Sequence, residues 1–244
     1  MDAQTALSPS VDSKTKFVGT LVLLGAPGAG KGTQAKAICA RYGIPQMSTG
    51  DLLRDNIARR TELGAKAKVF MDHGELVPDQ LVEDMLAARV VGGADTDRGF
   101  ILDGFPRTLP QAEWLDGFLD EWTAQHGEGR SYRPVVINVV VSYNELLRRL
   151  TGRRSCPTCG RIYNVYLQPP RVADVCDVDG SKLVTRPDDS EEVISERLRV
   201  YERQTLPLTD YYRAQGRLHE IDGDRDAATV AADILNLIEH GDRL

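Results

Sequence analysis

The sequence predicts an α/β protein whose parallel sheet is covered by helices on both faces. Three apolar runs, at residues 20–24, 99–103 and 134–141, have the composition of buried parallel strands. Helical patterns lie between these runs, and strands that alternate with helices form parallel sheets. The first run is stopped by a glycine-rich segment, as expected at the end of a buried strand.

The remaining elements follow in order along the chain. A fourth, shorter strand is expected at 217–221. The expected helices lie at about 31–41, 79–92, 109–123, 143–152, 190–214 and 226–239. Two stretches interrupt the alternation: residues 48–77 are helical and polar without a strand, and residues 152–189 are rich in Pro, Gly, Cys and Asp. The second stretch has too few aliphatic residues to bury much core, so we expect a small inserted domain there.

Bulk composition narrows the class of protein. The 244 residues suit one large domain with insertions or two small domains, and 41% hydrophobic residues suffice for a core. The net charge of −6 argues against a nucleic-acid scaffold. No apolar run is long enough to span a bilayer, and residues 1–16 lack the apolar core of a signal peptide. We expect a cytoplasmic protein with a disordered N-terminal tail and no membrane partner.

Residues 25–31 read Gly-Ala-Pro-Gly-Ala-Gly-Lys and fit the phosphate-binding pattern G-x-x-x-x-G-K between a strand and a helix. Glycines allow successive N–H groups to face phosphate oxygens, the helix N-terminus favours anions, and Lys31 adds a full charge. Gly32 stands where Ser or Thr is usual, with Thr33 next, so a loop hydroxyl cannot be assumed to coordinate magnesium. The alternative is a glycine-rich turn without a ligand. The order of strand, loop, lysine and helix argues against this alternative.

Three segments together resemble the adenylate kinases. They are the loop continued to Gln34, the run Ser-Thr-Gly-Asp-Leu-Leu-Arg at 48–54, and the run Leu-Asp-Gly-Phe-Pro-Arg-Thr at 102–108. The resemblance starts near residue 19 and omits the stretch near 121–133, which we interpret as a loop insertion. It implies a P-loop three-layer fold with a five-stranded parallel sheet, an inserted helical NMP-binding domain and a small lid domain.

The resemblance also implies a domain division and an activity. The core comprises residues 17–47, 78–151 and 190–244, the NMP-binding domain 48–77, and the lid 152–189. The implied reaction is ATP + AMP = 2 ADP, with Mg²⁺ bound to ATP. Both inserted domains are expected to close over the substrates, and the reaction is expected to maintain adenine nucleotide balance. The implied partners are ATP, AMP and ADP, with no nucleic acid. A monomer is expected, and the mitochondrial intermembrane space is the alternative compartment.

Site residues are carried over from the family one by one. Those implied to bind ATP are Gly28, Ala29, Gly30, Lys31, Gly32, Thr33, Arg149, Arg153, Ile162, Tyr163 and Arg225. Those implied to bind AMP are Thr49, Arg54, Glu75, Leu76, Val77, Gly104, Phe105, Pro106, Arg107, Gln111, Arg186 and Arg197. Those implied to act in catalysis are Lys31, Asp103, Arg107, Arg153, Arg186 and Arg197.

The chemistry of these residues agrees with the assignment. Arg54 and Arg107 are planar donors suited to a phosphate monoester, although a single arginine is more often a solvated surface charge. Gln111 offers a donor and an acceptor that can pair with an adenine edge. Asp103 ends a buried strand beside the loop, where a carboxylate can hold magnesium directly or through water. The alternative for Asp103 is a helix N-cap or a turn.

Three of the four cysteines cluster in residues 152–189. Cys156, Cys159, Cys176 and Asp179 follow the spacing C-x₂-C-x₁₆-C-x₂-D, close to a zinc ribbon whose fourth cysteine is replaced by aspartate. A segment with so little core would gain folding energy from a metal, so we predict structural Zn²⁺. A redox Cys-x-x-Cys and cysteines without a metal are the alternatives. The fourth, Cys39, is interpreted as a core thiol.

Two further interpretations complete the prediction. The pair Asp188 and Asp189 is expected to close the lid and to cap the next helix, without a catalytic role. The nearest rival function is a kinase of another monophosphate, GMP or UMP. A rival of another class is a nucleotide-dependent switch or zinc-ribbon binding module, which does not explain residues 103–107.

Overall fold

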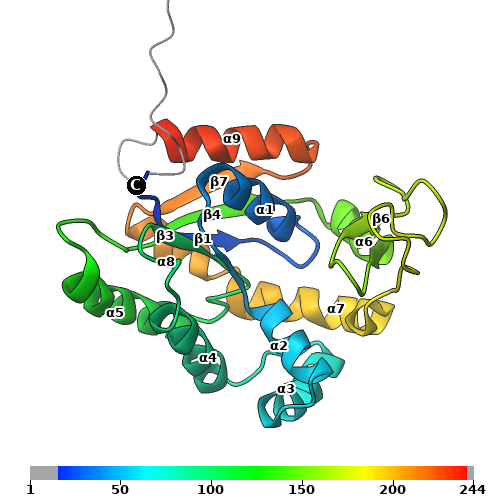
Figure 1. The fold of residues 1–244 in the computed structure, drawn as a ribbon, viewed down its shortest axis with the longest axis horizontal. Coiled ribbons are helices and arrows are strands. Elements are labelled where there is room, and N and C mark those ends of the chain that lie inside the picture. The colour runs from blue at the N-terminus through cyan, green and yellow to red at the C-terminus, as the bar shows by residue number, and fades with distance from the viewer. Residues whose placement is uncertain (1–15, 241–244) are drawn as a thin grey trace, which may run out of the picture.

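The computed structural model describes residues 16–240, and its centre is a single five-stranded sheet (Figure 1). The strand order is β2-β3-β1-β4-β7 and every neighbouring pair is parallel. The strands are β1 (Gly19–Leu24), β2 (Gln46–Ser48), β3 (Gly99–Asp103), β4 (Val135–Val140) and β7 (Leu218–Asp222). Their carboxyl ends therefore lie along one edge of the sheet, where ligands of open α/β sheets bind.

Four of these strands confirm the runs expected from the sequence, each within two residues. The fifth, β2, was not identified because only three residues pair and only Met47 among them is buried. Its register places Met47 beside Leu102 and Ser48 beside Asp103. This pairing brings the segment that begins at Ser48 next to the end of β3.

Helices cover both faces of the sheet. α1 (Lys31–Tyr42) and α9 (Ala227–His240) lie on one face, and α4 (Asp79–Val91), α5 (Leu109–His126) and α8 (Leu208–Ala214) lie on the other (Figure 1). Successive strand residues point to opposite faces. Accordingly, Leu21 and Leu23 of β1 pack with α1 and α9, and Val22 and Leu24 pack with the second group of helices.

Two insertions leave this three-layer core. Residues 48–77 form α2 (Thr49–Ala58) and α3 (Glu62–His73), which confirms the helical content expected there. The second insertion follows α6 (Tyr143–Thr151) and contains the antiparallel pair β5 (Arg153–Ser155) and β6 (Ile162–Asn164). Its buried cluster is small and consists of Cys156, Tyr163, Cys176 and Leu183.

The single helix expected over 190–214 is interrupted. A 3₁₀ turn (Pro187–Asp189) precedes α7 (Glu191–Val200), and a π-helical turn (Tyr201–Thr205) separates α7 from α8. Pro207 has no N–H to donate to a helical hydrogen bond. The amide of the preceding residue, Leu206, bonds to the carbonyl of Tyr201, five residues back rather than the four of an α-helix.

The expected loop insertion near 121–133 begins as helix, because α5 continues to His126. Within it, Trp122 and Tyr132 are buried, and the Tyr132 hydroxyl donates to the carbonyl of Asp97 at 2.6 Å. The expected N-terminal tail, apart from Lys16, lies outside the described residues. Among the helices described over 16–240, none has the length and apolarity needed to cross a membrane.

Candidate active site

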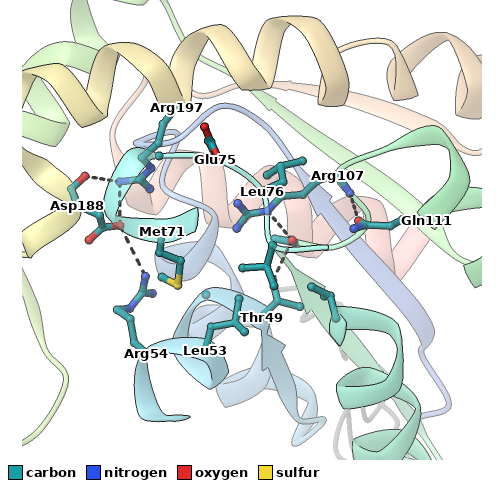
Figure 2. A pocket seen from close by; sticks show the side chains of 15 residues that line it. Thr49, Leu53, Arg54, Met71, Glu75, Leu76, Arg107, Gln111, Asp188 and Arg197 are labelled. Carbon is teal, nitrogen blue, oxygen red and sulfur yellow. Dashed lines mark hydrogen bonds and ion pairs between the residues drawn. The ribbon is translucent and has the colours of Figure 1, made fainter. Parts of the chain in front are cut away.

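Two cavities open at the carboxyl edge of the sheet. The larger measures about 800 Å³ and extends from the glycine loop to the lid and α7. The smaller measures about 60 Å³ and lies between α2, α3 and residues 104–111 (Figure 2). Arg54, Gly104, Arg107 and Arg197 line both cavities, so the two spaces meet at a basic junction.

The glycine loop joins β1 to the N-terminus of α1. Gly28 and Gly30 have φ of +87° and +95°, a region in which residues with a side chain are strained. A Cβ on Gly28 would also lie 2.9 Å from Cγ of Leu150. Lys31 Nζ donates to the carbonyls of Gly25 at 2.7 Å and Ala26 at 3.0 Å. The loop therefore holds its lysine against the wall of the larger cavity.

The Lys31 ammonium lies in an environment that opposes its charge. Burial lowers the pKa of Lys31 to about 8, and Asp103 opposes the effect while Arg107 and Arg197 add to it. A phosphate in the cavity would supply the missing counter-charge.

Asp103 lies where β3 ends, facing the loop. Its carboxylate accepts a hydrogen bond from Gln46 Nε2 at 2.9 Å. The N-cap alternative is wrong, because Ser48 and Thr108 cap the two neighbouring helices. A Cβ added to Gly32 would lie 3.5 Å from Asp103 Oδ2, so the missing side chain leaves room beside this carboxylate.

Arginines from several elements surround the junction of the cavities. Arg54 belongs to α2, Arg153 to β5 and Arg197 to α7, while Arg107 and Arg186 lie on connecting segments. Burial, together with repulsion from neighbouring arginines, lowers the pKa of Arg107 and of Arg186 to about 10. Such a concentration of partly buried positive charge is suited to a polyanionic ligand.

Asp188 and Asp189 pair with these arginines. The Asp189 side chain is fully buried and accepts from Arg153 and from Arg197. Asp188 lies 3.0 Å from Arg197 and 3.9 Å from Arg54 (Figure 2). Burial would raise the pKa of Asp188, but these arginines outweigh it and hold the pKa below its usual range.

The expected capping role for this aspartate pair is therefore wrong. The N-cap of α7 is Ser190, whose hydroxyl accepts from the amide of Val193 at 3.4 Å. Both aspartates belong to the preceding 3₁₀ turn, which directs them toward the cavity arginines. No local sequence signal marks this role, because the arginine partners are brought to the aspartates by the fold.

The smaller cavity has a polar rim around an apolar lining. Thr49 is buried and its hydroxyl donates to the carbonyl of Gly104 at 2.9 Å. Gly104 has φ of +83°, and a Cβ there would lie 2.9 Å from both Thr49 Oγ1 and Arg107 Nη2. Gln111 also lines this cavity and lies beside Arg107 (Figure 2). The apolar lining comes from Leu53, Met71, Leu76, Val77 and Val82.

The structure brings the predicted nucleotide-binding residues together, with one exception. Phe105 lines neither cavity, because its ring is 1% exposed and packs edge-on against Trp114. The predicted residues along the larger cavity are Gly28, Ala29, Gly30, Lys31, Gly32, Thr33, Arg54, Gly104, Pro106, Arg107, Arg149, Arg153, Ile162, Tyr163, Arg186, Arg197 and Arg225. Those along the smaller one are Thr49, Arg54, Glu75, Leu76, Val77, Gly104, Arg107, Gln111 and Arg197.

Two supporting residues were not identified from the sequence. Gln46 holds the Asp103 carboxylate, and Thr205 in the π-helical turn donates to the carbonyl of Arg107 at 2.9 Å. No sequence motif marks either residue, because each acts through a contact with a segment far away in the chain.

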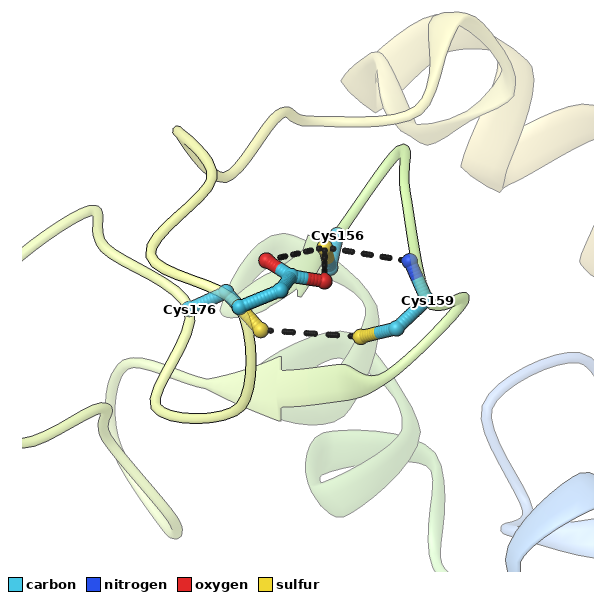
Figure 3. Close-up of side chains that lie close together, drawn as sticks. Cys156, Cys159 and Cys176 are labelled. Atoms are coloured by element: carbon cyan, nitrogen blue, oxygen red, sulfur yellow. Dashed lines mark hydrogen bonds between the residues drawn. The ribbon is translucent and has the colours of Figure 1, made fainter.

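The cysteine cluster of the lid gathers four potential metal ligands at one point. One ligand atom from each of Cys156, Cys159, Cys176 and Asp179 lies within 4.8 Å of the other three (Figure 3). The sulfurs of Cys159 and Cys176 are 3.6 Å apart, close to the roughly 3.7 Å edge expected for zinc–sulfur bonds of ~2.3 Å. The four residues can therefore hold a metal ion.

Two similar turns build this cluster. The amide of Gly160 bonds to the carbonyl of Cys156, and that of Gly180 bonds to the carbonyl of Cys176. Both glycines have positive φ. Asp179 thus takes the place in the second turn that Cys159 takes in the first. The amide of Ser181 donates to the Asp179 carboxylate at 2.9 Å and holds its pKa well below the usual range, so the carboxylate is charged.

Comparisons with known proteins agree with this geometry. A family model described as adenylate kinase matches residues 23–217. An adenylate kinase of Archaeoglobus fulgidus is 49% identical over 219 residues, which cover 90% of this chain and 97% of that protein. An adenylate kinase of Nitrosococcus oceani is 50% identical over 221 residues, covering 89% and 97% respectively. One of Lachnospira eligens is 48% identical over 218 residues, covering 89% and 99%.

Replacing Lys31 by methionine should stabilise the protein. Because the folded-state pKa of about 8 lies below the usual lysine pKa of 10.5, the charged lysine destabilises the native state fully below pH 8. We expect Lys31→Met to raise the free energy of unfolding by about 1 kcal/mol at pH 7, a figure reduced for solvent screening. Urea denaturation measures this difference, which should shrink as the pH rises from 8 toward 10.5.

The control is Lys36→Met, on the same helix but exposed, which should change stability by no more than about 0.5 kcal/mol. A Lys31→Met protein less stable than the unmodified one at pH 7 would contradict the electrostatic account.

Proposed function

The chain belongs to the adenylate kinase family, and we propose on that basis that it catalyses the reversible transfer ATP + AMP = 2 ADP. The observation that carries the proposal is the junction of the two cavities, where Arg54, Arg107 and Arg197 line both. A triphosphate reaching from the glycine loop and a monophosphate in the smaller cavity would meet at this junction with their phosphates in contact with the same arginines.

The residues at the junction act by positioning and by neutralising charge. Phosphoryl transfer leaves little covalent chemistry to the protein, and the stabilisation comes from groups placed around the transferring phosphate. Lys31, Arg107, Arg153, Arg186 and Arg197 supply that charge. The acceptor is an anionic phosphate, so no general base is needed, and we assign none.

Magnesium fits beside Asp103. The carboxylate is a hard oxygen ligand, and the absence of a side chain on Gly32 leaves room next to it. Bound with ATP, magnesium neutralises phosphate charge. We assign to Asp103 the holding of that ion, directly or through water, and to Gln46 the orientation of the carboxylate.

Closure of the lid and of α2–α3 over the substrates is part of the proposal. Arg153 comes from the lid, Arg54 from α2 and Arg197 from α7, and all three pair with the adjacent Asp188 and Asp189. The aspartates thus link both insertions to the core. Closure would exclude water, which otherwise competes with AMP for the transferred phosphate.

An assay of ADP formation tests the activity. Purified protein with ATP and magnesium should form ADP with AMP as acceptor, and less efficiently with GMP or UMP. Preference for GMP or UMP would identify a different monophosphate kinase. Slow ADP formation that no monophosphate accelerates would support a nucleotide-dependent switch instead.

Arg107→Ala should lower kcat/KM for AMP at least a hundredfold, because its guanidinium lines both cavities and would contact the transferring phosphate. The same assay measures the loss. Arg59→Ala is the matched control, since Arg59 is an exposed arginine that pairs with Asp55 within its own helix. A decrease of less than about tenfold, or roughly 1.4 kcal/mol, would remove Arg107 from the reaction centre.

We propose further that the metal of the lid is a structural Zn²⁺. Three thiolates and one carboxylate are a donor set suited to zinc, and the 3.6 Å between the sulfurs of Cys159 and Cys176 is close to one edge of a tetrahedral zinc site. The lid buries only a small cluster, of which two members are cysteines, so a metal would supply much of its folding energy.

Metal analysis of protein purified without chelators should give close to one zinc per chain. Cys176→Ser should lose the metal and lower the melting temperature, while Cys39→Ser, in α1, should retain it. Unmodified protein that contains no metal and yet melts at the same temperature before and after chelator treatment would refute the structural role.

Three further properties stay predictions: a monomeric state, an absence of nucleic-acid partners and a cytoplasmic location. The mitochondrial intermembrane space is the alternative compartment.

A further inference from the structure

The side-chain amide of Gln111 is held at both ends. Gln111 is 2% exposed and lines the smaller cavity. Its Oε1 accepts from the backbone N–H of Arg107 at 2.7 Å, and its Nε2 donates to Oδ1 of Asp79 at 2.7 Å. The other carboxylate oxygen of Asp79 accepts from the Thr108 hydroxyl at 3.0 Å. Two segments, residues 107–111 and the first turn of α4, are therefore joined at this amide.

The chemistry of these partners permits one orientation of the amide. A backbone N–H can only donate, and a carboxylate can only accept. Turning the amide over would set its oxygen against the Asp79 carboxylate and its NH₂ against the Arg107 N–H, which loses both hydrogen bonds and leaves buried polar groups unpaired. In the allowed orientation the amide retains one hydrogen and one lone pair for a ligand.

The order of that remaining donor and acceptor distinguishes purines. The Watson–Crick edge of adenine offers an acceptor at N1 and a donor at the 6-amine, which match an NH₂ and a carbonyl oxygen. A 6-oxopurine reverses both positions, with a donor at N1 and an acceptor at O6, and would need the amide turned over. Such a mismatch leaves polar groups unpaired in a buried site and weakens binding strongly.

We propose that Asp79 is a specificity-determining residue, which by fixing the orientation of the Gln111 amide selects a 6-aminopurine monophosphate over a 6-oxopurine monophosphate. Asp79 lines neither cavity and acts only through Gln111, so it is a positioning residue. The inference rests on the proposed function, because it assigns the base of the acceptor nucleotide in that reaction.

The test compares AMP with IMP, whose ribose and phosphate are identical and whose edge is reversed. Asp79→Ala removes the acceptor that holds Nε2. We expect the ratio of kcat/KM for AMP to that for IMP to fall about tenfold or more, the magnitude of one hydrogen bond to a charged group. Asp79→Asn keeps a carbonyl oxygen for Nε2 and should restore the ratio to within threefold of the unmodified protein.

The control is Asp84→Ala, which removes a carboxylate from an exposed position of the same helix, bonded to Gln80, and should leave the ratio unchanged. If Asp79→Ala does not fold, Asp79→Ser replaces it, because serine suits the helix start but is too short to reach Gln111. Equal losses with AMP and IMP would show a structural role only and overturn the proposal. Unmodified protein that forms no ADP from AMP would refute the proposed function, whereas activity with an unaltered ratio in Asp79→Ala would refute only this inference.

Discussion

The crowding of partly buried positive charges around one cavity is the constraint on which the site depends. Lys31, Arg107, Arg153, Arg186 and Arg197 converge on one cavity from separate elements. Burial and their mutual repulsion lower the pKa of Lys31 to about 8 and those of Arg107 and Arg186 to about 10. A protein interior tolerates such a group only with counter-charges or when a polyanion binds. The site without a ligand is therefore electrostatically unfavourable, and binding of a phosphate would relieve the repulsion.

The acidic residues of the site make this arrangement compatible with folding. Asp103 faces Lys31 from the end of β3, and the fully buried Asp189 pairs with Arg153 and Arg197. Each carboxylate is held by an element whose geometry is independent of a ligand, a parallel strand in one case and a 3₁₀ turn in the other. Because the aspartate pair contacts the lid, α2 and α7, the counter-charges also connect the parts that carry the arginines.

The smaller cavity follows a different principle, in which a fully bonded polar group is set into an apolar wall. Gln111 is surrounded by partners of fixed polarity, so its own orientation is fixed. A buried network of this kind costs free energy when one of its polar groups is unpaired, and it permits a single arrangement of side chains when all of them are paired. The lid likewise depends on polar groups, because it has almost no apolar core and brings three thiols and a carboxylate together at one point.

Local chemistry in the sequence was sufficient for the main architecture. Three apolar runs identified β1, β3 and β4, because burial on both faces of a parallel sheet leaves an uninterrupted hydrophobic pattern. The edge strand β7 was expected from a shorter and more polar run. The glycine loop, the run that contains Asp103 and Arg107, and the spacing of Cys156 to Asp179 predicted the nucleotide site and the cysteine cluster from the sequence alone. In each case the function needs particular residue types close together in the chain.

Contacts between segments that lie far apart in the sequence could not be predicted from local residue patterns. Three residues of β2 carry no periodic signal, and their strand exists because they pair with β3. The aspartates after Arg186 look like helix caps until the fold brings Arg153 and Arg197 to them. Asp79 and Gln111 lie 32 residues apart on two helices, and only the packing of those helices brings the carboxylate to the amide. Residue type and spacing encode which groups are available, whereas the register of the sheet and the packing of the helices determine which of them meet.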